Sequence, residues 1–211
     1  MGARREVPLK ALVSEISTYC SNVTYALTDV SSREDMENMV NLACSTFGRL
    51  DVLIANAGIG PISPMDELRV EDWEAMIDIN LKGYLYGIAA ALPIFRQQEK
   101  GHFVSVISTS GLRVVAGQAV YAGTKNVIRT INEALRIEAG ANLRVTGVSP
   151  GVVRTQFTDS MTDPAMQAQV KAAMEMVGMS PEAVARAIVF AIAQPDDVDV
   201  GDIVVRSTAQ A

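Results

Sequence analysis

Short apolar runs alternate with helix-like segments along the chain, and this alternation restricts the fold more than any other feature. The apolar runs are residues 23–30, 50–58, 102–109, 143–151 and 201–208. Apolar residues recur at helical spacing in residues 8–16, 32–48, 70–98, 118–140 and 180–195. Strands that are apolar on both faces and alternate with helices are typical of a parallel sheet covered on both sides. The sequence therefore predicts an α/β fold with a doubly wound, Rossmann-like parallel sheet.

The chain reads as one domain, residues 1–211, because no Pro/Gly/Ser-rich linker divides it and its length suits a single core. Helix signals are clear in residues 32–48, where Ser32 can cap the first turn and Gly48 can end the last. The predicted strands end in small or polar residues. Since sites in parallel sheets lie at the carboxyl ends of the strands, we expect the functional site there.

Composition excludes several classes of function. The net charge is −6, and the densest basic cluster is Arg4–Arg5, so nucleic-acid binding is not expected. One histidine, His102, and two cysteines argue against a His-based triad, a multi-His metal site and a disulfide framework, and fit a reducing cytoplasm. We expect His102 at the surface. No 18-residue apolar run predicts a membrane span.

Tyr121 and Lys125 are four residues apart in a predicted helix and therefore share a face. A lysine ammonium near a phenol favours the phenolate and lowers the tyrosine pKa. A tyrosine of this kind can transfer a proton to or from a substrate oxygen. Taken alone, the pair also fits an incidental contact at the surface.

Further residues surround this pair in a fixed order along the chain. The stretches that contain them are "ANAG" (55–58), "INLKG" (79–83), "ISTSG" (107–111), "YAGTK" (121–125) and "SPGVVRT" (149–155). In this order and at these separations they resemble the short-chain dehydrogenase/reductase family, over essentially the whole chain. The segments 92–109 and 194–210 resemble most a bacterial branch that oxidises 3-hydroxy acids such as serine, or related small alcohols.

The resemblance implies the catalytic roles. Tyr121 would be the general acid or base at the substrate oxygen, and Lys125 would lower its pKa and bind the nicotinamide ribose. Ser108 would hydrogen-bond the substrate oxygen as charge develops. Asn80 would hold a water in the proton path to Lys125. A buried helix amide is the alternative for Asn80.

The resemblance also implies a nicotinamide cofactor and the residues that bind it. These would be Arg4, Arg5, Asp29, Val30, Asn56, Ala57, Gly58, Tyr121, Lys125, Pro150, Gly151, Val153 and Thr155. Asp29 and Val30 would meet the adenine, Asn56–Gly58 would lie along the cofactor, and Pro150–Thr155 would face the nicotinamide. Asp29 as a cap and Pro150–Gly151 as a plain turn are the alternatives.

The family's Gly-rich turn, T-G-x-x-x-G-x-G, has no counterpart in this sequence. Residues 2–16 resemble the segment after the family's second strand, where an arginine can pair with the 2′-phosphate of NADP. Arg4 and Arg5 therefore favour NADP over NAD; solvated surface arginines are the alternative. We expect the domain to lack its first strand–helix–strand unit, and the 211-residue chain alone to be poorly stable and to bind NADP weakly or not at all.

The expected function is interconversion of a small secondary alcohol and its ketone by hydride transfer. The expected enzyme is a cytoplasmic homo-oligomer, a dimer or tetramer. One alternative is an inactive fragment that acts only by associating with other subunits through the helices at 70–98 and 118–140. Another is a sugar-nucleotide epimerase or dehydratase, which shares the Y-x-x-x-K motif, although few residues after Lys125 remain for a substrate domain.

Overall fold

The computed structural model describes residues 1–210, and every pair of neighbouring strands in them runs parallel. The larger sheet has the order β3-β4-β5-β6, built from β3 (Val52–Ala55), β4 (Gly101–Val106), β5 (Leu143–Pro150) and β6 (Asp202–Val205). A separate small sheet pairs β1 (Gly2–Ala3) with β2 (Ala26–Leu27). The predicted α/β fold with a parallel sheet is confirmed.

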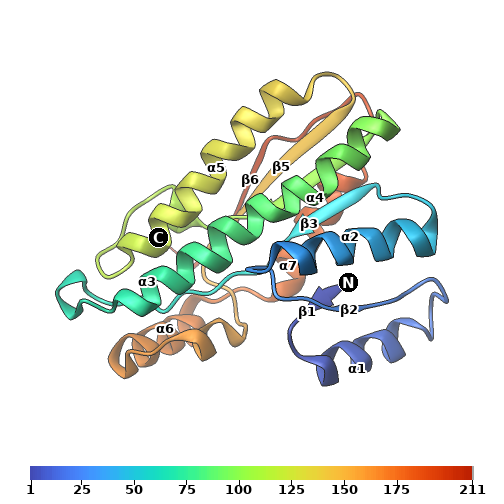
Figure 1. Cartoon of the computed structure of the whole chain (residues 1–211). Coiled ribbons are helices and arrows are strands. Elements are labelled where there is room, and N and C mark those ends of the chain that lie inside the picture. The colour runs from blue at the N-terminus through green and yellow to red at the C-terminus, as the bar shows by residue number, and fades with distance from the viewer. Residues whose placement is uncertain (211) are drawn as a thin grey trace.

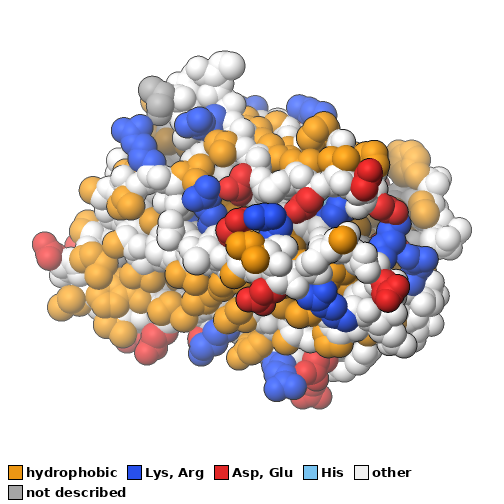
Figure 2. Space-filling model, turned by 90° about the horizontal axis from the view of Figure 1, so that it is seen from above, with side chains coloured by type: hydrophobic (Ala, Val, Ile, Leu, Met, Phe, Trp, Pro, Cys, Tyr) orange, Lys and Arg blue, Asp and Glu red, His pale blue; other side chains and the backbone are white. Residues whose placement is uncertain are grey.

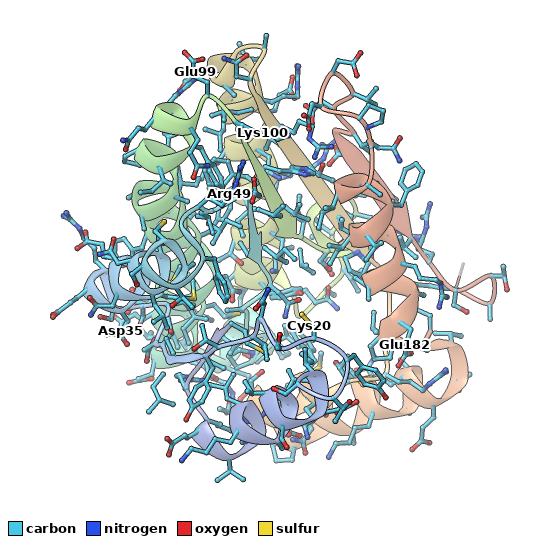
Figure 3. All side chains as sticks on the ribbon, turned by 90° about the vertical axis from the view of Figure 1, so that its right-hand side faces the viewer. Cys20, Asp35, Arg49, Glu99, Lys100 and Glu182 are labelled. Atoms are coloured by element: carbon cyan, nitrogen blue, oxygen red, sulfur yellow. The ribbon has the colours of Figure 1, made fainter. Side chains whose placement is uncertain are left out.

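Helices connect the strands and cover both faces of the larger sheet. They are α1 (Glu6–Ile16), α2 (Arg33–Phe47), α3 (Val70–Met76), α4 (Gly83–Gln98), α5 (Ala119–Ala139), α6 (Pro164–Val177) and α7 (Pro181–Ile192). In Figure 3, α2 and α4 lie on one side of this sheet and α7 lies on the other. The small sheet lies apart from the larger one, with α1 beneath it (Figure 1).

The helix expected at residues 70–98 is α3 and α4 joined without a break by a π-helical turn, η2 (Ile77–Lys82). Short 3₁₀ turns occupy η1 (Met65–Glu67), η3 (Thr109–Gly111) and η4 (Gln156–Ser160). No helix in residues 1–210 is long and apolar enough to cross a membrane.

The termini of α2 confirm the predicted capping. The Ser32 hydroxyl accepts a hydrogen bond from the Asp35 backbone N–H at 3.2 Å, which satisfies one free donor of the first turn. Gly48 ends the helix with φ of 78°, a conformation that glycine adopts without a Cβ clash.

The main core lies between the larger sheet and helices α4 and α5. Its buried apolar residues are Leu53, Ala91, Phe95, Phe103, Leu135, Ala139, Leu143 and Val145. The Phe95 and Phe103 rings meet edge to face with centroids 4.9 Å apart. Burial of these side chains holds the carboxyl ends of β3, β4 and β5 at one edge of the sheet.

Three expectations differ from the structure. His102 is buried, with 2% of its surface exposed, because β4 lies between β3 and β5; its Nε2 lies 2.8 Å from the Thr146 hydroxyl. The strand expected at residues 23–30 is only Ala26–Leu27. In α1 the expected apolar face is largely open: Leu9 is buried, but Leu12 is 43% exposed, because few elements pack against this helix.

Candidate active site

Tyr121 and Lys125 lie one turn apart near the start of α5, and both are buried. The Lys125 Nζ is 5.9 Å from the centroid of the Tyr121 ring and donates a hydrogen bond to the Val106 carbonyl at 2.9 Å. Val106 is the last residue of β4. The pair is therefore not a surface contact: α5 presents it to the carboxyl edge of the sheet.

Burial shifts both ionisable groups toward their neutral forms. It raises the pKa of Tyr121 to about 12, and a hydrogen bond with Ser108 partly offsets this rise. It lowers the pKa of Lys125 to about 8. Desolvation disfavours a charged group of either sign, which explains the opposite directions. The causes of the Tyr121 shift are its burial and the Ser108 hydrogen bond, so a lowering of the Tyr121 pKa by Lys125 stays a prediction.

Ser108 follows β4 and caps the 3₁₀ turn η3. Its Oγ accepts a hydrogen bond from the Ser110 backbone N–H at 3.1 Å, and its hydroxyl hydrogen-bonds the Tyr121 phenol. The Ser110 hydroxyl in turn donates to the Gln118 side chain at 2.7 Å, one residue before α5. These contacts tie the turn after β4 to the start of α5, so that Ser108 and Tyr121 face each other.

Asn80 lies in the π-helical turn η2 and has 2% of its surface exposed. Its Oδ1 accepts from the Ile59 N–H at 2.8 Å, and its Nδ2 donates to the Ile59 carbonyl at 2.9 Å and to the Thr124 hydroxyl at 3.2 Å. A π turn widens the helix locally and is frequent at functional sites. Here it places one amide so that it links the loop after β3 to α5.

Gly58 lies against the same groups. A β carbon at this position would stand 3.3 Å from the Asn80 Oδ1 and 3.4 Å from the Lys125 Nζ. A larger side chain would fill the space in front of Lys125. Because Gly58 has no side chain, the space between the Lys125 ammonium and the loop at residues 56–58 stays free.

Two adjoining cavities contain all the residues that the sequence proposed for the site. The first cavity has a volume of about 890 Å³. The proposed site residues that border it are Arg4, Arg5, Asp29, Val30, Asn56, Ala57, Gly58, Asn80 and Lys125. The second cavity, of about 970 Å³, is bordered by Arg5, Asn56, Gly58, Ser108, Tyr121, Lys125, Pro150, Gly151, Val153 and Thr155. Arg5, Asn56, Gly58 and Lys125 border both, so the two cavities adjoin at these residues.

Asp29 and Arg5, which border the first cavity, also make hydrogen bonds to other protein groups. The Asp29 carboxylate accepts hydrogen bonds from the Ser31 hydroxyl at 2.6 Å and the Ser31 N–H at 2.9 Å, and these bonds lower the pKa of Asp29. Asp29 thus caps a turn, as its alternative interpretation expected. Arg5 donates to the Gln156 side chain at 3.1 Å, and Arg4 is exposed.

Segments η4 and α6 cover the second cavity with apolar side chains that the motifs did not single out. The Phe157 ring meets the Tyr121 ring edge to face with centroids 5.5 Å apart. Tyr121 also belongs to a cluster with Ile62, Met76 and Met161. The hydroxyl of Ser160 accepts from the Gly60 N–H at 3.1 Å. Nothing in the local sequence pattern identifies Phe157 or Thr124 as site residues.

Comparisons with known proteins show the family of the chain. A family model described as short chain dehydrogenase matches residues 1–165. An uncharacterized oxidoreductase of Listeria monocytogenes is 38% identical over 213 residues, which take in 100% of this chain and 86% of the relative.

Two solved structures are also similar. The alcohol dehydrogenase of the archaeon Thermococcus sibiricus, complexed with 5-hydroxy-NADP, is 28% identical with a TM-score of 0.87, covering 100% of this chain and 86% of that one. A closed form of serine dehydrogenase complexed with NADP⁺ is 30% identical with a TM-score of 0.89, covering 100% and 85%. The chain belongs to the short-chain dehydrogenase/reductase family and is an oxidoreductase of this type.

Proposed function

We propose that this protein interconverts a small secondary alcohol and its ketone by hydride transfer with NADP(H). The observation that carries the proposal is the arrangement of Ser108 with the buried Tyr121 and Lys125 at the carboxyl edge of the sheet, beside two cavities that meet at Gly58 and Lys125, the first of which extends to Arg4. When bound, NADP⁺ would accept the hydride from the alcohol carbon or, as NADPH, return it to the carbonyl carbon.

The protein's own residues would handle the proton and the geometry. Tyr121 would exchange the hydroxyl proton with the substrate oxygen, and Ser108 would donate a hydrogen bond to that oxygen as it gains negative charge. Lys125 and Asn80 would hold the cofactor ribose and a water in the proton path. Phe157 and Met174, which both border the second cavity, would exclude bulk water from the reacting atoms.

The raised pKa of Tyr121 bears on the direction of the reaction. With a pKa of about 12, the phenol is protonated at neutral pH and is ready to donate a proton. A general acid is what carbonyl reduction needs, whereas alcohol oxidation needs the phenolate. Oxidation, which needs the phenolate, is therefore expected to gain rate as the pH rises, because the phenolate fraction increases with pH.

Substitution of Tyr121 tests the chemistry. Tyr121→Phe removes only the acidic hydroxyl and is expected to lower kcat for reduction of a ketone panel by about 10²–10⁴-fold, with little change in NADPH affinity. Tyr19→Phe, at an exposed position, is the matched control and should leave kcat unchanged. An active Tyr121→Phe enzyme would reject Tyr121 as the acid. A chain that binds NADPH and turns over no ketone or alcohol would favour the alternative of an inactive fragment.

The preference for NADP over NAD rests on Arg4 and Arg5, and on the NADP named with the two similar structures. An arginine–phosphate contact contributes about 1.5–3 kcal/mol, so Arg4→Ala with Arg5→Ala should weaken NADPH binding at least about tenfold and leave NADH binding unchanged. Titration with each nucleotide measures this. Equal losses for both would place the arginines away from the 2′-phosphate.

Assembly into a cytoplasmic dimer or tetramer belongs to the same proposal. Leu85 on α4 and Val127 and Ile137 on α5 are exposed apolar residues, and Figure 2 shows hydrophobic side chains gathered on one part of the face seen from above. Such patches on helices support subunit contact. Light scattering of the purified protein measures the mass, and a monomer at micromolar concentration would contradict it.

A further inference from the structure

Three buried polar side chains meet where α4, α5 and β4 come together, and the proposed function uses none of them. They are Tyr84 of α4, Asn132 of α5 and Ser105 of β4, here called the Asn132 cluster. The Tyr84 hydroxyl donates a hydrogen bond to the Asn132 Oδ1, and the Asn132 Nδ2 donates to the Ser105 Oγ at 2.5 Å. One amide of α5 therefore links this helix both to α4, which lies beside it in Figure 1, and to the sheet.

The Asn132 cluster lies in apolar surroundings. Tyr84 packs in a cluster with Ile107 and Ile128, whose contacts are non-directional and by themselves allow a helix to slide or turn on the sheet. Hydrogen bonds accept only a narrow range of distances and angles. A buried polar network whose members are satisfied therefore favours one arrangement of the elements that it joins.

The same side of α5 makes a second polar contact with β4. Lys125 precedes Asn132 by seven residues, which is close to two helical turns, so the two side chains share a face. Asn132 bonds the side chain of Ser105, and the Lys125 Nζ donates to the carbonyl of Val106, the next residue of β4, at 2.9 Å. A slide of α5 by one residue is about 1.5 Å and would break both contacts. Neither contact alone would fix the rotation of the helix.

We propose that Asn132 is a positioning residue of the active site: through Ser105 and Tyr84 it fixes α5 against β4 and α4, and this placement holds the Lys125 ammonium at the Val106 carbonyl. Asn132 borders neither of the two cavities, so it acts through Lys125 and does not touch substrate or cofactor. The consequence for turnover rests on the proposed function, whereas the placement of Lys125 does not.

An NMR titration of the lysine Cε signals measures this placement without cofactor or substrate, with Lys125 assigned from Lys125→Met. Asn132→Leu nearly preserves the volume of the side chain and removes both of its hydrogen bonds. Loss of the placement lets water reach the ammonium, so the pKa of Lys125 is expected to rise from about 8 toward its ordinary 10.5. Tyr121, the titratable side chain beside Lys125, stays protonated throughout this range.

Two further variants separate placement from stability. Leu135→Ala, on the same helix, removes packing from the main core and leaves the Asn132 cluster intact; it should destabilise the protein and leave the pKa of Lys125 near 8. Ser105→Ala removes the β4 partner with a small change in volume. It should raise the pKa of Lys125 as Asn132→Leu does, and it carries the test if Asn132→Leu does not fold.

Turnover gives a second readout. In Asn132→Leu, kcat for ketone reduction should fall by about tenfold to a hundredfold, because a small displacement of a catalytic group has effects of this order. If the pKa of Lys125 rises in this variant but even the unchanged protein turns over no ketone or alcohol, the positioning role stands and the proposed function fails.

Two outcomes would overturn the proposal. One is an unchanged pKa of Lys125 in both Ser105→Ala and a folded Asn132→Leu. The other is an equal rise in Leu135→Ala, since any loss of packing around α5 would then release Lys125. A rise that is confined to the variants of the Asn132 cluster supports the proposal.

Discussion

Lys125→Met tests the energetic consequence of burying an ammonium beside Tyr121. Burial lowers the pKa of Lys125 from 10.5 to about 8. The folded protein therefore binds this proton less tightly than the unfolded chain does, and between pH 8 and 10.5 the unfolded state carries more protons. Stability consequently rises with pH through this window. Below pH 8 the full cost is present, and at ~1.4 kcal/mol per pKa unit it amounts to about 3 kcal/mol.

Urea unfolding at pH 7 and at pH 9.5 measures this cost. The unchanged protein should gain about 2 kcal/mol between the two values, because most of the window lies below pH 9.5. Lys125→Met should lack this gain. Lys171→Met, at an exposed position, is the control and should keep it. The raised pKa of Tyr121 has the opposite sign, since that phenol stabilises the fold less as pH rises from 10 to 12, and it does not act in this range.

One result would refute the reasoning. If the protein and Lys125→Met gain stability in parallel between pH 7 and pH 9.5, the gain comes from other groups. The terminal amine of Met1, whose pKa burial also lowers, is one such group, and it is present in all three proteins. The ammonium of Lys125 would then be solvated in solution, and the site would not be as closed as the structure shows.

Two further predictions concern stability, and thermal or urea denaturation checks both. Gly101→Ala should lower the free energy of unfolding by about 1–3 kcal/mol, because the added β carbon would overlap the ring of the fully buried Phe95. Gly123→Ala on α5 should raise it by up to about 1 kcal/mol, because a β carbon there meets no atom within 4 Å. Equal effects of the two substitutions would contradict the packing. Ser32→Ala should cost about 1 kcal/mol through loss of the α2 cap, and Ser45→Ala on the same helix should cost less; if both cost the same, the cap contributes nothing specific.

The elements of the fold could be predicted from the sequence where their signals are local. The helix at α2 shows this most clearly, because Ser32 and Gly48 satisfy or end the helix through their own side chains or backbone. The order of strands and helices followed from apolar periodicity in the same way. The catalytic pair could also be predicted from the sequence, because the spacing along one helix places Tyr121 and Lys125 on the same face whatever surrounds them.

Properties that depend on distant partners could not be predicted in this way. His102 is buried because two other strands flank it, and its burial and the neighbouring Arg144 lower its pKa to about 4. Phe157 reaches Tyr121 from a segment 36 residues further along the chain. Neither contact has a local signature, because each depends on the packing of segments that are far apart in sequence.

The sequence by itself determined the alternation of elements, the family and the residues that meet at the carboxyl edge of the sheet, because these depend on periodicity and on the spacing of a few side chains. Only the tertiary structure decided the ionisation of Tyr121 and Lys125, since the degree of burial sets the cost of a charge. It also decided that β1 and β3 stand apart with a cavity between them, because strand pairing joins segments that no local pattern relates.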